Sequence, residues 1–430
     1  MKPGAFSRVR GMNDLLPEEA HHFAMIETAA REVFEAAGFG EIRLPMVEDS
    51  RLFARSIGEA TDIVEKEMYT FKDRNGDALA LRPEATAGCV RAVIEHDLTR
   101  GGPQRLWYRG PMFRHERPQK GRHRQFHQIG VEVFGIASPD LEAELLLLAQ
   151  SLWERLGLEG LTLELNSLGT AEERLRYRSV LADYFAVHRG ALEPDDQERL
   201  KRNPLRLFDS KSAATQAFLA QAPLLSDSLG ETSRLHWQRV RTLLDAMGIP
   251  YRVNPRLVRG LDYYTQTVFE WTSTALGAQS AVCSGGRYDG LVEMLGGGST
   301  PAMGWALGLE RLAALLTRKA VERPFAVLVT LGDAAEESGF TLVREIRRTH
   351  PGLGIVLCAG PGPLKAKLKR ADRLRAARAL ILGEEELAQG VVQVKTLEGP
   401  PRVDFVPRSE VVAYLAQVAL SLNPVPVRER

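Results

Sequence analysis

The stretch FRHERPQKGRHRQFHQIGVEVFG, residues 113–135, changes character near its middle. Its first half is strongly basic: eleven positions hold one acid, Glu116, against the cations Arg114, Arg117, Lys120, Arg122 and Arg124. Its second half alternates polar and apolar residues with the two-residue period of a β-strand. Together with RLWYRGPMFRH at 105–115, it predicts a long antiparallel hairpin whose tip is the basic bend.

The two faces of the second predicted strand differ in chemistry. One face carries Ile129, Val131 and Val133, which suit a hydrophobic core. The other face carries, in order, Arg124, Phe126, Gln128, Gly130 and Glu132. A cation, an aromatic ring, an amide, a position without a side chain and a carboxylate are suitable groups for a pocket floor. The basic bend would grip phosphates, the ring would lie against a base, and the gap at Gly130 would admit a small ligand.

Two other interpretations of the bend stay open from this stretch alone. A solvated hairpin tip fits the charges equally well, because charge clusters on protein surfaces are common. His115, His123 and His127 suggest a metal, but their spacing of 8 and 4 residues matches no standard zinc site. The sequence therefore assigns no metal ligands.

The whole chain has the composition of a globular protein. Its 430 residues suffice for two or three domains, and 44% hydrophobic and 26% charged residues are ordinary values. It contains no apolar run of membrane-spanning length, and its first residues lack the apolar core of a secretory signal. Three cysteines lie far apart, which favours a reducing compartment. We therefore expect a cytoplasmic protein without a membrane segment.

The formal net charge of +1 means that any phosphate-binding surface must be local. Besides the bend, one other window qualifies, KAKLKRADRLRAAR at 365–378, which holds seven basic residues and one acid. On a helix, Leu364, Leu368 and Ala371 would face a sheet. The outward residues would then be Lys365, Lys367, Lys369, Arg370 and Arg373. RNA phosphates and plain solvent are equally good partners for such a face.

Several segments have clear periodicity. Residues 21–40 have apolar positions at helical spacing and predict a helix that stops at Gly38. Residues 41–48 predict a strand that must tolerate Pro45, and 79–88 predict a strand that runs into a helix.

The composition and periodicity of the sequence change at two places. From about 169 to 230 it is charged and helix-like, which predicts a helical insertion. After residue 323, short apolar runs alternate with helical stretches, which predicts a parallel α/β domain. We therefore expect a first domain at 1–322, interrupted by the insertion, and a second at 324–420.

The motifs together resemble those of histidyl-tRNA synthetases, a family of class II aminoacyl-tRNA synthetases. GPMFRHERPQKGRHRQFHQIGVEVFG resembles the second class II signature, GFGEIRLP the first, and GWALGLERL at 304–312 the third. LVRGLDYYTQTVFE at 257–270 and SGGRYDG at 284–290 are similar to stretches particular to the histidine enzymes. LRPEATAG resembles their amino-acid-binding loop, where the family usually has glycine at the position of Ala85.

The resemblance implies an α+β catalytic domain: an antiparallel sheet flanked by helices, with a helical insertion. It implies a C-terminal α/β anticodon-binding domain as well. Such an enzyme activates L-histidine with ATP, accompanied by Mg²⁺, to histidyl-adenylate and pyrophosphate. It then transfers histidine to the 3′ end of its tRNA. The family also implies a homodimer, formed through the helix and strand of the first signature.

The resemblance gives the cations roles at the ATP phosphates, where negative charge gathers in the transition state. Arg114 and Arg259 would be catalytic and hold the α-phosphate from opposite sides. Arg311 would take the γ-phosphate and cover adenine, and Arg122 would assist at the phosphate tail. Phe126 would stack on the other face of adenine.

A neutral imidazole has one donor and one acceptor nitrogen, so its pocket must supply the complement. By resemblance, Glu132 accepts from the N–H, while the hydroxyls of Tyr264 and Tyr288 supply the rest. The implied histidine site comprises Glu84, Thr86, Arg114, Gln128, Glu132, Arg259, Tyr263, Tyr264 and Tyr288. Within it, Glu84, Thr86 and Gln128 would hold the α-ammonium group. Gly285 and Gly286 would let the backbone approach the ligand, and Arg117 and Gln119 would lie near the tRNA acceptor end.

Two rival functions deserve comparison. The histidyl-synthetase-like regulatory subunit of ATP phosphoribosyltransferase is a binding module that typically lacks the C-terminal domain and the arginine of LVRGLDYY. This chain has both features. A class II enzyme for threonine, proline or glycine would share the C-terminal domain type, but the stretches at 257–270 and 284–290 argue against it.

Overall fold

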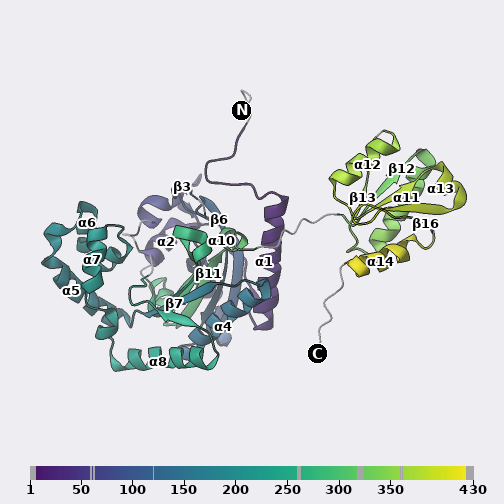
Figure 1. Ribbon diagram of the computed structural model, residues 1–430. Coiled ribbons are helices and arrows are strands. Elements are labelled where there is room, and N and C mark those ends of the chain that lie inside the picture. The colour runs from purple at the N-terminus through teal and green to yellow at the C-terminus, as the bar shows by residue number, and fades with distance from the viewer. Residues whose placement is uncertain are drawn as a thin grey trace. The chain divides into compact units, whose positions relative to one another are not determined.

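The computed structural model describes residues 6–58, 61, 63–119, 121–258, 263–316, 324–358, 360 and 362–422. The chain divides into two compact units, Met1–Lys319 and Ala320–Arg430. Figure 1 shows the elements of both units. In the part of the chain that the structure describes, no helix combines the length and apolarity that crossing a bilayer requires.

The described residues of the larger unit form an eight-stranded sheet with the order β1-β5-β6-β11-β10-β9-β7-β8. The strands are β1 Gly40–Glu41, β5 Gln104–Phe113, β6 Gln125–Phe134, β7 Leu161–Ser167, β8 Tyr251–Val253, β9 Thr265–Ser273, β10 Ala281–Arg287 and β11 Ala302–Gly308. The inner pairs are antiparallel, and the edge pairs β1–β5 and β7–β8 are parallel. The predicted antiparallel sheet and its long β5–β6 hairpin are confirmed.

Helices cover this sheet. They are α1 Pro17–Ala36, α2 Ser50–Ile57, α3 Thr86–Glu95, α4 Pro139–Leu156, α8 Glu231–Ala246, α9 Leu291–Met294 and α10 Leu309–Ala313, with short turns at Ile63–Glu67, Leu98–Gly101 and Thr274–Gln279. Ile129, Val131 and Val133 of β6 are fully buried in one cluster with residues of α1, α4, α8 and α10. The predicted alternation of β6 is therefore confirmed, and its opposite face is left for the site.

The predictions for the first helix and for the strand after it are only partly confirmed. The helix α1 ends at Ala36, and Gly38 has a φ of 81°, as expected for a glycine stop. The strand predicted over 41–48 is wrong, because β1 ends at Glu41 and the next strand begins only at Val47. Between them, Arg82 donates to the carbonyls of Leu44 (2.9 Å) and Pro45 (3.3 Å), so these groups bond a side chain instead of a ladder.

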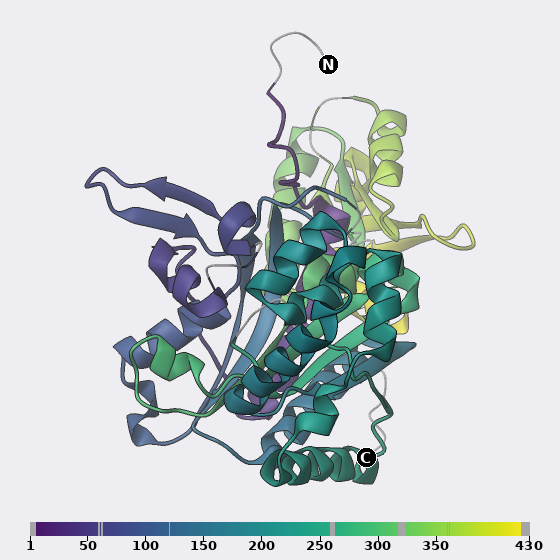
Figure 2. The ribbon, with the colours of Figure 1, turned by 90° about the vertical axis from the view of Figure 1, so that its left-hand side faces the viewer.

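A second, three-stranded sheet lies beside α3. Its strands are β2 Val47–Asp49, β3 Tyr69–Lys72 and β4 Ala78–Leu81, in the order β2-β4-β3. In Figure 2 the β3–β4 hairpin projects from one side of the larger unit. The prediction of a strand that leads into a helix over 79–88 is confirmed by β4 and α3.

The predicted insertion consists of helices. They are α5 Ala171–Ala186, α6 Pro194–Arg202 and α7 Ala213–Gln221, with 3₁₀ turns at Arg189–Ala191, Pro204–Asp209 and Leu225–Ser228. Figure 1 shows α5, α6 and α7 gathered into one group. Their core is not separate from the sheet, because Tyr177, Leu181 and Phe185 share one buried cluster with Tyr264 and Tyr288.

The smaller unit has a five-stranded sheet with the order β13-β12-β14-β15-β16. Its elements are β12 Ala326–Thr330, α11 Asp333–Thr349, β13 Ile355–Leu357, α12 Leu364–Arg373, β14 Arg378–Leu382, α13 Glu384–Gln389, β15 Val391–Thr396, β16 Val403–Pro407 and α14 Val411–Leu422. The predicted parallel α/β arrangement is found in β13, β12 and β14, while β15 and β16 run antiparallel to their neighbours. The connections before them are too short for a parallel crossover, which needs about a dozen residues.

The amphipathic pattern of α12 is mostly as expected. Leu364, Leu368 and Ala371 pack towards the sheet in one apolar cluster. Lys367 is not directed outward, since its Nζ donates to the carbonyl of Thr330 at 2.8 Å. The exposed cations of the helix are Lys365, Lys369 and Arg373.

Candidate active site

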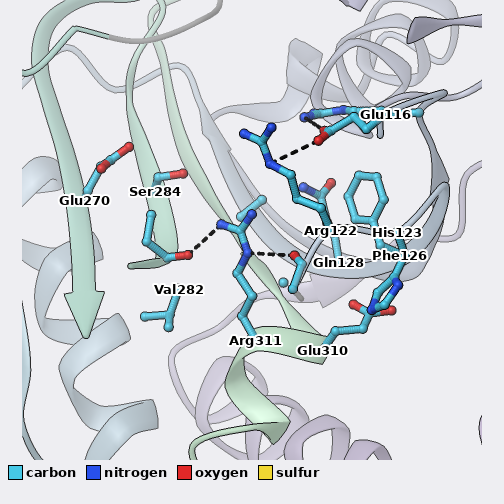
Figure 3. A pocket seen from close by; sticks show the side chains of 15 residues that line it. Glu116, Arg122, His123, Phe126, Gln128, Glu270, Val282, Ser284, Glu310 and Arg311 are labelled. Atoms are coloured by element: carbon cyan, nitrogen blue, oxygen red, sulfur yellow. Dashed lines mark hydrogen bonds and ion pairs between the residues drawn. The ribbon is translucent and has the colours of Figure 1, made fainter. Parts of the chain in front are cut away.

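A cavity of about 330 Å³ lies over the start of β6 and the basic bend (Figure 3). Groups from three places line it: the β5–β6 bend, the neighbouring strands β9, β10 and β11, and α10. Its charged and aromatic lining residues are Arg114, Glu116, Arg122, His123, Phe126, Glu270, Glu310 and Arg311. The hairpin and the third sequence signature therefore meet in one hollow.

Three guanidinium groups border this cavity. Arg122 Nε lies 3.0 Å from Glu116 Oε2, and Arg114 Nη1 lies 4.0 Å from the other oxygen of that carboxylate. Arg311 donates to the carbonyls of Ala281 (2.8 Å) and Gly121 (3.2 Å), which fixes its head between β10 and the bend. Burial and the nearby Arg122 lower the pKa of Arg311. The arrangement suits an anion with several negative oxygens.

Phe126 reaches into the cavity from β6, and Arg311 reaches into it from α10 (Figure 3). The guanidinium carbon of Arg114 lies 5.4 Å from the centroid of the Phe126 ring, within cation–π range. Arg114 also donates from Nε to the carbonyl of Pro83 at 2.9 Å. The structure thus brings together Arg114, Arg122, Phe126 and Arg311, the predicted ATP-binding residues.

Further along β6, Glu132 is buried and receives three hydroxyl groups. Thr86 Oγ1 donates to its Oε1 at 2.7 Å, Tyr108 donates to the same oxygen at 3.1 Å, and Tyr288 donates to Oε2. Among the described residues no cation pairs with this carboxylate. Burial raises the pKa of Glu132 to about 8, although the hydroxyl donors act in the opposite direction.

Glu84 lies two residues before Thr86, the first residue of α3. Its carboxylate accepts from the backbone N–H groups of Thr86 (2.6 Å) and Ala87 (3.0 Å), and burial raises its pKa. The neighbouring Ala85 has a φ of −116°, a conformation that alanine adopts without strain. The usual glycine is therefore not required there.

Aromatic rings complete the buried polar cluster around Glu132. The rings of Tyr263 and Tyr264 lie 4.6 Å apart, and those of Tyr263 and Tyr288 lie 5.6 Å apart. All three are at most 6% exposed. Gln128 lines the cavity and lies on β6 between the cavity and this cluster, and its Oε1 is buried without a hydrogen-bond partner in the described structure. An orphaned amide oxygen at that place can accept from a ligand's ammonium group.

The glycines near the site pack closely against other protein groups. A methyl group built on Gly130 would overlap the Tyr108 ring, so the predicted gap for a ligand is filled by protein. A methyl group on Gly286 would meet the Tyr264 ring at 3.0 Å, and one on Gly285 would meet the β11 backbone at Trp305 at 2.6 Å. These glycines allow close packing of protein groups, and the predicted approach of the Gly285 and Gly286 backbone to a ligand stays a prediction.

Two sets of residues were missed from the sequence. Tyr108 stands directly opposite Gly130 in the hairpin register, a pairing that could have been counted from the bend. Arg287 is fully buried and donates to both oxygens of Glu142 at 2.8 Å, and His236 Nε2 lies 2.6 Å from the same carboxylate. Nothing local signals this second network, because its members come from β10, α4 and α8.

The remaining predicted residues lie elsewhere or outside the described chain. Arg259 belongs to the residues that the structure does not describe. Arg117 and Gln119 are exposed at the hairpin tip, where Gln119 forms a bridge with Arg122. They are well placed for a large external partner.

The three histidines of the hairpin have three separate partners. His115 packs edge-on against Tyr69 at 5.5 Å, His123 Nδ1 bonds Asn13 at 3.0 Å, and His127 Nδ1 bonds Glu310 at 2.9 Å. In the described ranges, no group of three His, Cys, Asp or Glu side chains has the arrangement of a metal site. The cavity does hold the carboxylates of Glu116 and Glu270, and Mg²⁺ commonly binds one or two carboxylates together with substrate phosphates.

Comparison with known proteins gives concordant results. The family model of histidyl-tRNA synthetase matches residues 11–312. The apo histidyl-tRNA synthetase of S. aureus is 33% identical with a TM-score of 0.79, and the match covers 96% of this chain and all of that one.

Two more distant structures show the fold alone. A histidyl-tRNA synthetase from Nostoc is 20% identical with a TM-score of 0.70, covering 96% of this chain and 100% of that one. An ATP phosphoribosyltransferase regulatory subunit/histidyl-tRNA synthetase from Bacillus halodurans is 24% identical with a TM-score of 0.63, covering 86% and 97%.

Proposed function

The chain belongs to the histidyl-tRNA synthetase family, and from this premise we propose that it is a working histidine–tRNA ligase. It activates L-histidine with ATP to histidyl-adenylate and pyrophosphate, then transfers histidine to the 3′ end of its tRNA. We assign the catalytic role to residues 1–322 and anticodon binding to 324–420.

One observation carries this proposal: a cavity suited to phosphates and a buried polar cluster lie in sequence along one face of β6. Phe126 and the cations border the cavity, and Glu132 with its hydroxyl donors forms the cluster. Residues on one strand face repeat about every 6.7 Å, so Gln128 stands between the two. An ATP α-phosphate in the cavity and the carboxylate of a histidine bound at the cluster would meet near Gln128.

The first step forms a bond between a carboxylate oxygen of histidine and the α-phosphorus, and it breaks the bond from that phosphorus to pyrophosphate. Negative charge gathers on the α-phosphate oxygens, which Arg114 is placed to stabilise. Arg311 and Arg122 would hold the phosphate tail, and Phe126 would lie against adenine. Mg²⁺ would neutralise phosphate oxygens, with Glu116 and Glu270 as the suitable carboxylates.

Amino-acid selection depends on the buried carboxylate. Glu132 accepts a hydrogen bond from the imidazole N–H, while Tyr264 supplies a further polar contact. A ring of similar size without an N–H would leave Glu132 unsatisfied in a buried site, which is costly. Glu84 and the orphaned oxygen of Gln128 would hold the α-ammonium group.

The tRNA would contact both units. The exposed tip residues Arg117 and Gln119 lie on the same hairpin as the cavity and would reach the acceptor end. Lys365, Lys369 and Arg373 on α12 would contact phosphates, so tRNA affinity should fall with salt.

We also propose a cytoplasmic homodimer formed through α1 and β1. This pairing is the one that the resemblance of residues 38–45 to the first class II signature implies. The regulatory-subunit function remains the alternative, since a protein of that description has the same fold.

ATP–pyrophosphate exchange with each of the twenty amino acids separates the two functions. Purified full-length protein should exchange with histidine alone. Arg114→Ala should lower the rate at least a hundredfold, because one preorganised charge at a transition state is worth about that factor. Arg51→Ala, at an exposed arginine outside the cavity and the cluster, is the matched control and should change the rate less than twofold. Absence of exchange with every amino acid would favour the regulatory function.

A further inference from the structure

Tyr108 and Gly130 face each other across the β5–β6 hairpin. Tyr108 is 2% exposed, and its ring occupies the space that a side chain at position 130 would need. The ring therefore crosses the β6 backbone at Gly130, and its hydroxyl reaches Glu132, two residues further along the strand. Only glycine at position 130 permits this path.

The three hydroxyl groups divide unequally between the two oxygens of Glu132. An ionised carboxylate has about four acceptor positions, two on each oxygen, and the raised pKa of Glu132, about 8, makes this form prevalent only at alkaline pH. Oε1 accepts from both Thr86 (2.7 Å) and Tyr108 (3.1 Å), so its positions are filled. Oε2 accepts from Tyr288 among the described residues and lies against the backbone of Gly304, where an added methyl group would meet it at 1.7 Å.

We propose that Tyr108 is a positioning residue for amino-acid selection: by holding Oε1 of Glu132, it fixes the orientation in which this carboxylate receives the N–H of the ligand's ring. This inference rests on the proposed function, because it concerns the same cluster. Tyr108 acts through Glu132 and does not itself touch the ligand.

Removal of the hydroxyl has two physical consequences. Oε1 gains an open acceptor position, so the carboxylate is free to rotate away from the orientation that receives the ligand N–H. The ionised carboxylate also loses one donor, which moves its titration to higher pH. Loss of packing alone would produce neither effect.

The test is Tyr108→Phe in the full-length chain, which keeps the ring and removes only the hydroxyl. Histidine-dependent pyrophosphate exchange is measured from pH 6 to 9.5, with the KM for histidine, the KM for ATP and kcat at each pH. We expect the KM for histidine to rise about tenfold, with kcat and the KM for ATP within twofold. We expect the midpoint of the pH profile of the histidine KM to move upward.

Gly130→Ala is the second variant, because it keeps the hydroxyl and displaces the ring. It should raise the KM for histidine in the same direction. Tyr177→Phe is the matched control: Tyr177 is equally buried, but its hydroxyl donates to the carbonyl of Pro223 in the insertion at 2.8 Å. It should leave the histidine KM and its pH midpoint unchanged.

Two results for Tyr108→Phe would overturn the inference: an unchanged histidine KM and midpoint, or equal losses for histidine and ATP, as a purely structural role would give. Calorimetric titration with histidine separates this question from the proposed function. If wild-type protein binds histidine but exchanges no pyrophosphate, the ligase proposal fails, and weaker histidine binding by Tyr108→Phe still supports the inference. Equal binding by the two proteins would refute it.

Discussion

Glu132 and Glu142 are both almost completely buried in the larger unit, yet their surroundings are opposite. Two consecutive residues at the end of β10 reach them: Arg287 donates to Glu142, and Tyr288 donates to Glu132. Glu142 also lies against His236 at 2.6 Å. Glu132 has only hydroxyl donors among the described residues.

The pKa values of the two carboxyl groups move in opposite directions. Burial opposes ionisation in both, but the bonds from Arg287 and His236 outweigh it and lower the pKa of Glu142. At Glu132 burial dominates and raises the pKa to about 8. Glu142 therefore belongs to a completed ion pair that ties β10 to α4 and α8, whereas Glu132 still needs a partner. A buried carboxylate without a cation is the stronger sign of a ligand site.

The largest effect is expected on the Glu142 side. Arg287→Met leaves a buried carboxylate with only His236, and breaking one partner of a buried pair costs about 3–5 kcal/mol. Urea unfolding at pH 7 should show this loss. The double variant Glu142→Leu with Arg287→Met removes both charges and should recover most of the stability. If the free energy of unfolding of Arg287→Met falls by less than about 1 kcal/mol, the Arg287–Glu142 pair does not stabilise the fold.

Glu132→Gln should have the reverse profile, with function lost and the fold kept. The amide retains the volume and part of the hydrogen bonding but cannot offer the same acceptor to an imidazole N–H. We expect the KM for histidine to rise about 30- to 150-fold, because a buried group left unpaired costs about 2–3 kcal/mol. The KM for ATP should stay within threefold in the same exchange assay. Equal losses for histidine and ATP would contradict the separation of the cavity from the cluster.

The two sides also differ in how far the sequence could predict them. The alternation that places Glu132 opposite Ile129 and Val131 is local, and it predicted the face correctly. The hydroxyl donors come from α3, β5 and the end of β10, so only resemblance to a family suggested Thr86 and Tyr288. Arg287 and Glu142 are 145 positions apart, and no periodicity links them.

The errors have the same origin. The strand expected through Pro45 failed because a distant side chain, Arg82, takes the backbone carbonyls there. Gly130 was interpreted as an opening because its cross-strand neighbour, Tyr108, was not considered. The antiparallel orientation of β15 and β16 agrees with the short connections before them, which a parallel crossover could not use. The local residue period predicts on which face of a strand a side chain lies. Long-range pairing determines which groups the side chain contacts there.

The smallest effect is a difference in how stability depends on pH. The pKa of Glu132 is about 8 in the folded state and 4.5 as its ordinary value, so the folded protein keeps a proton that the unfolded chain has lost. Its contribution to the free energy of unfolding is therefore present at low pH and falls as pH rises from about 4.5 to 8. Glu142, with its lowered pKa, contributes in the opposite sense: its stabilisation is lost as pH falls.

Comparison of wild type with Glu132→Gln isolates the first contribution, because Glu142 is the same in both. The difference in Tm should change by roughly 1–3 °C per pH unit between pH 5.5 and 7.5, with the wild type losing stability relative to the variant as pH rises. Above about pH 8.5 the difference should become constant. Thermal unfolding in buffers matched for ionic strength provides the measurement. If the difference in Tm does not change from pH 5.5 to 8.5, the protein already compensates the charge of Glu132, as it does that of Glu142. The two carboxylates would then not differ in the way argued above.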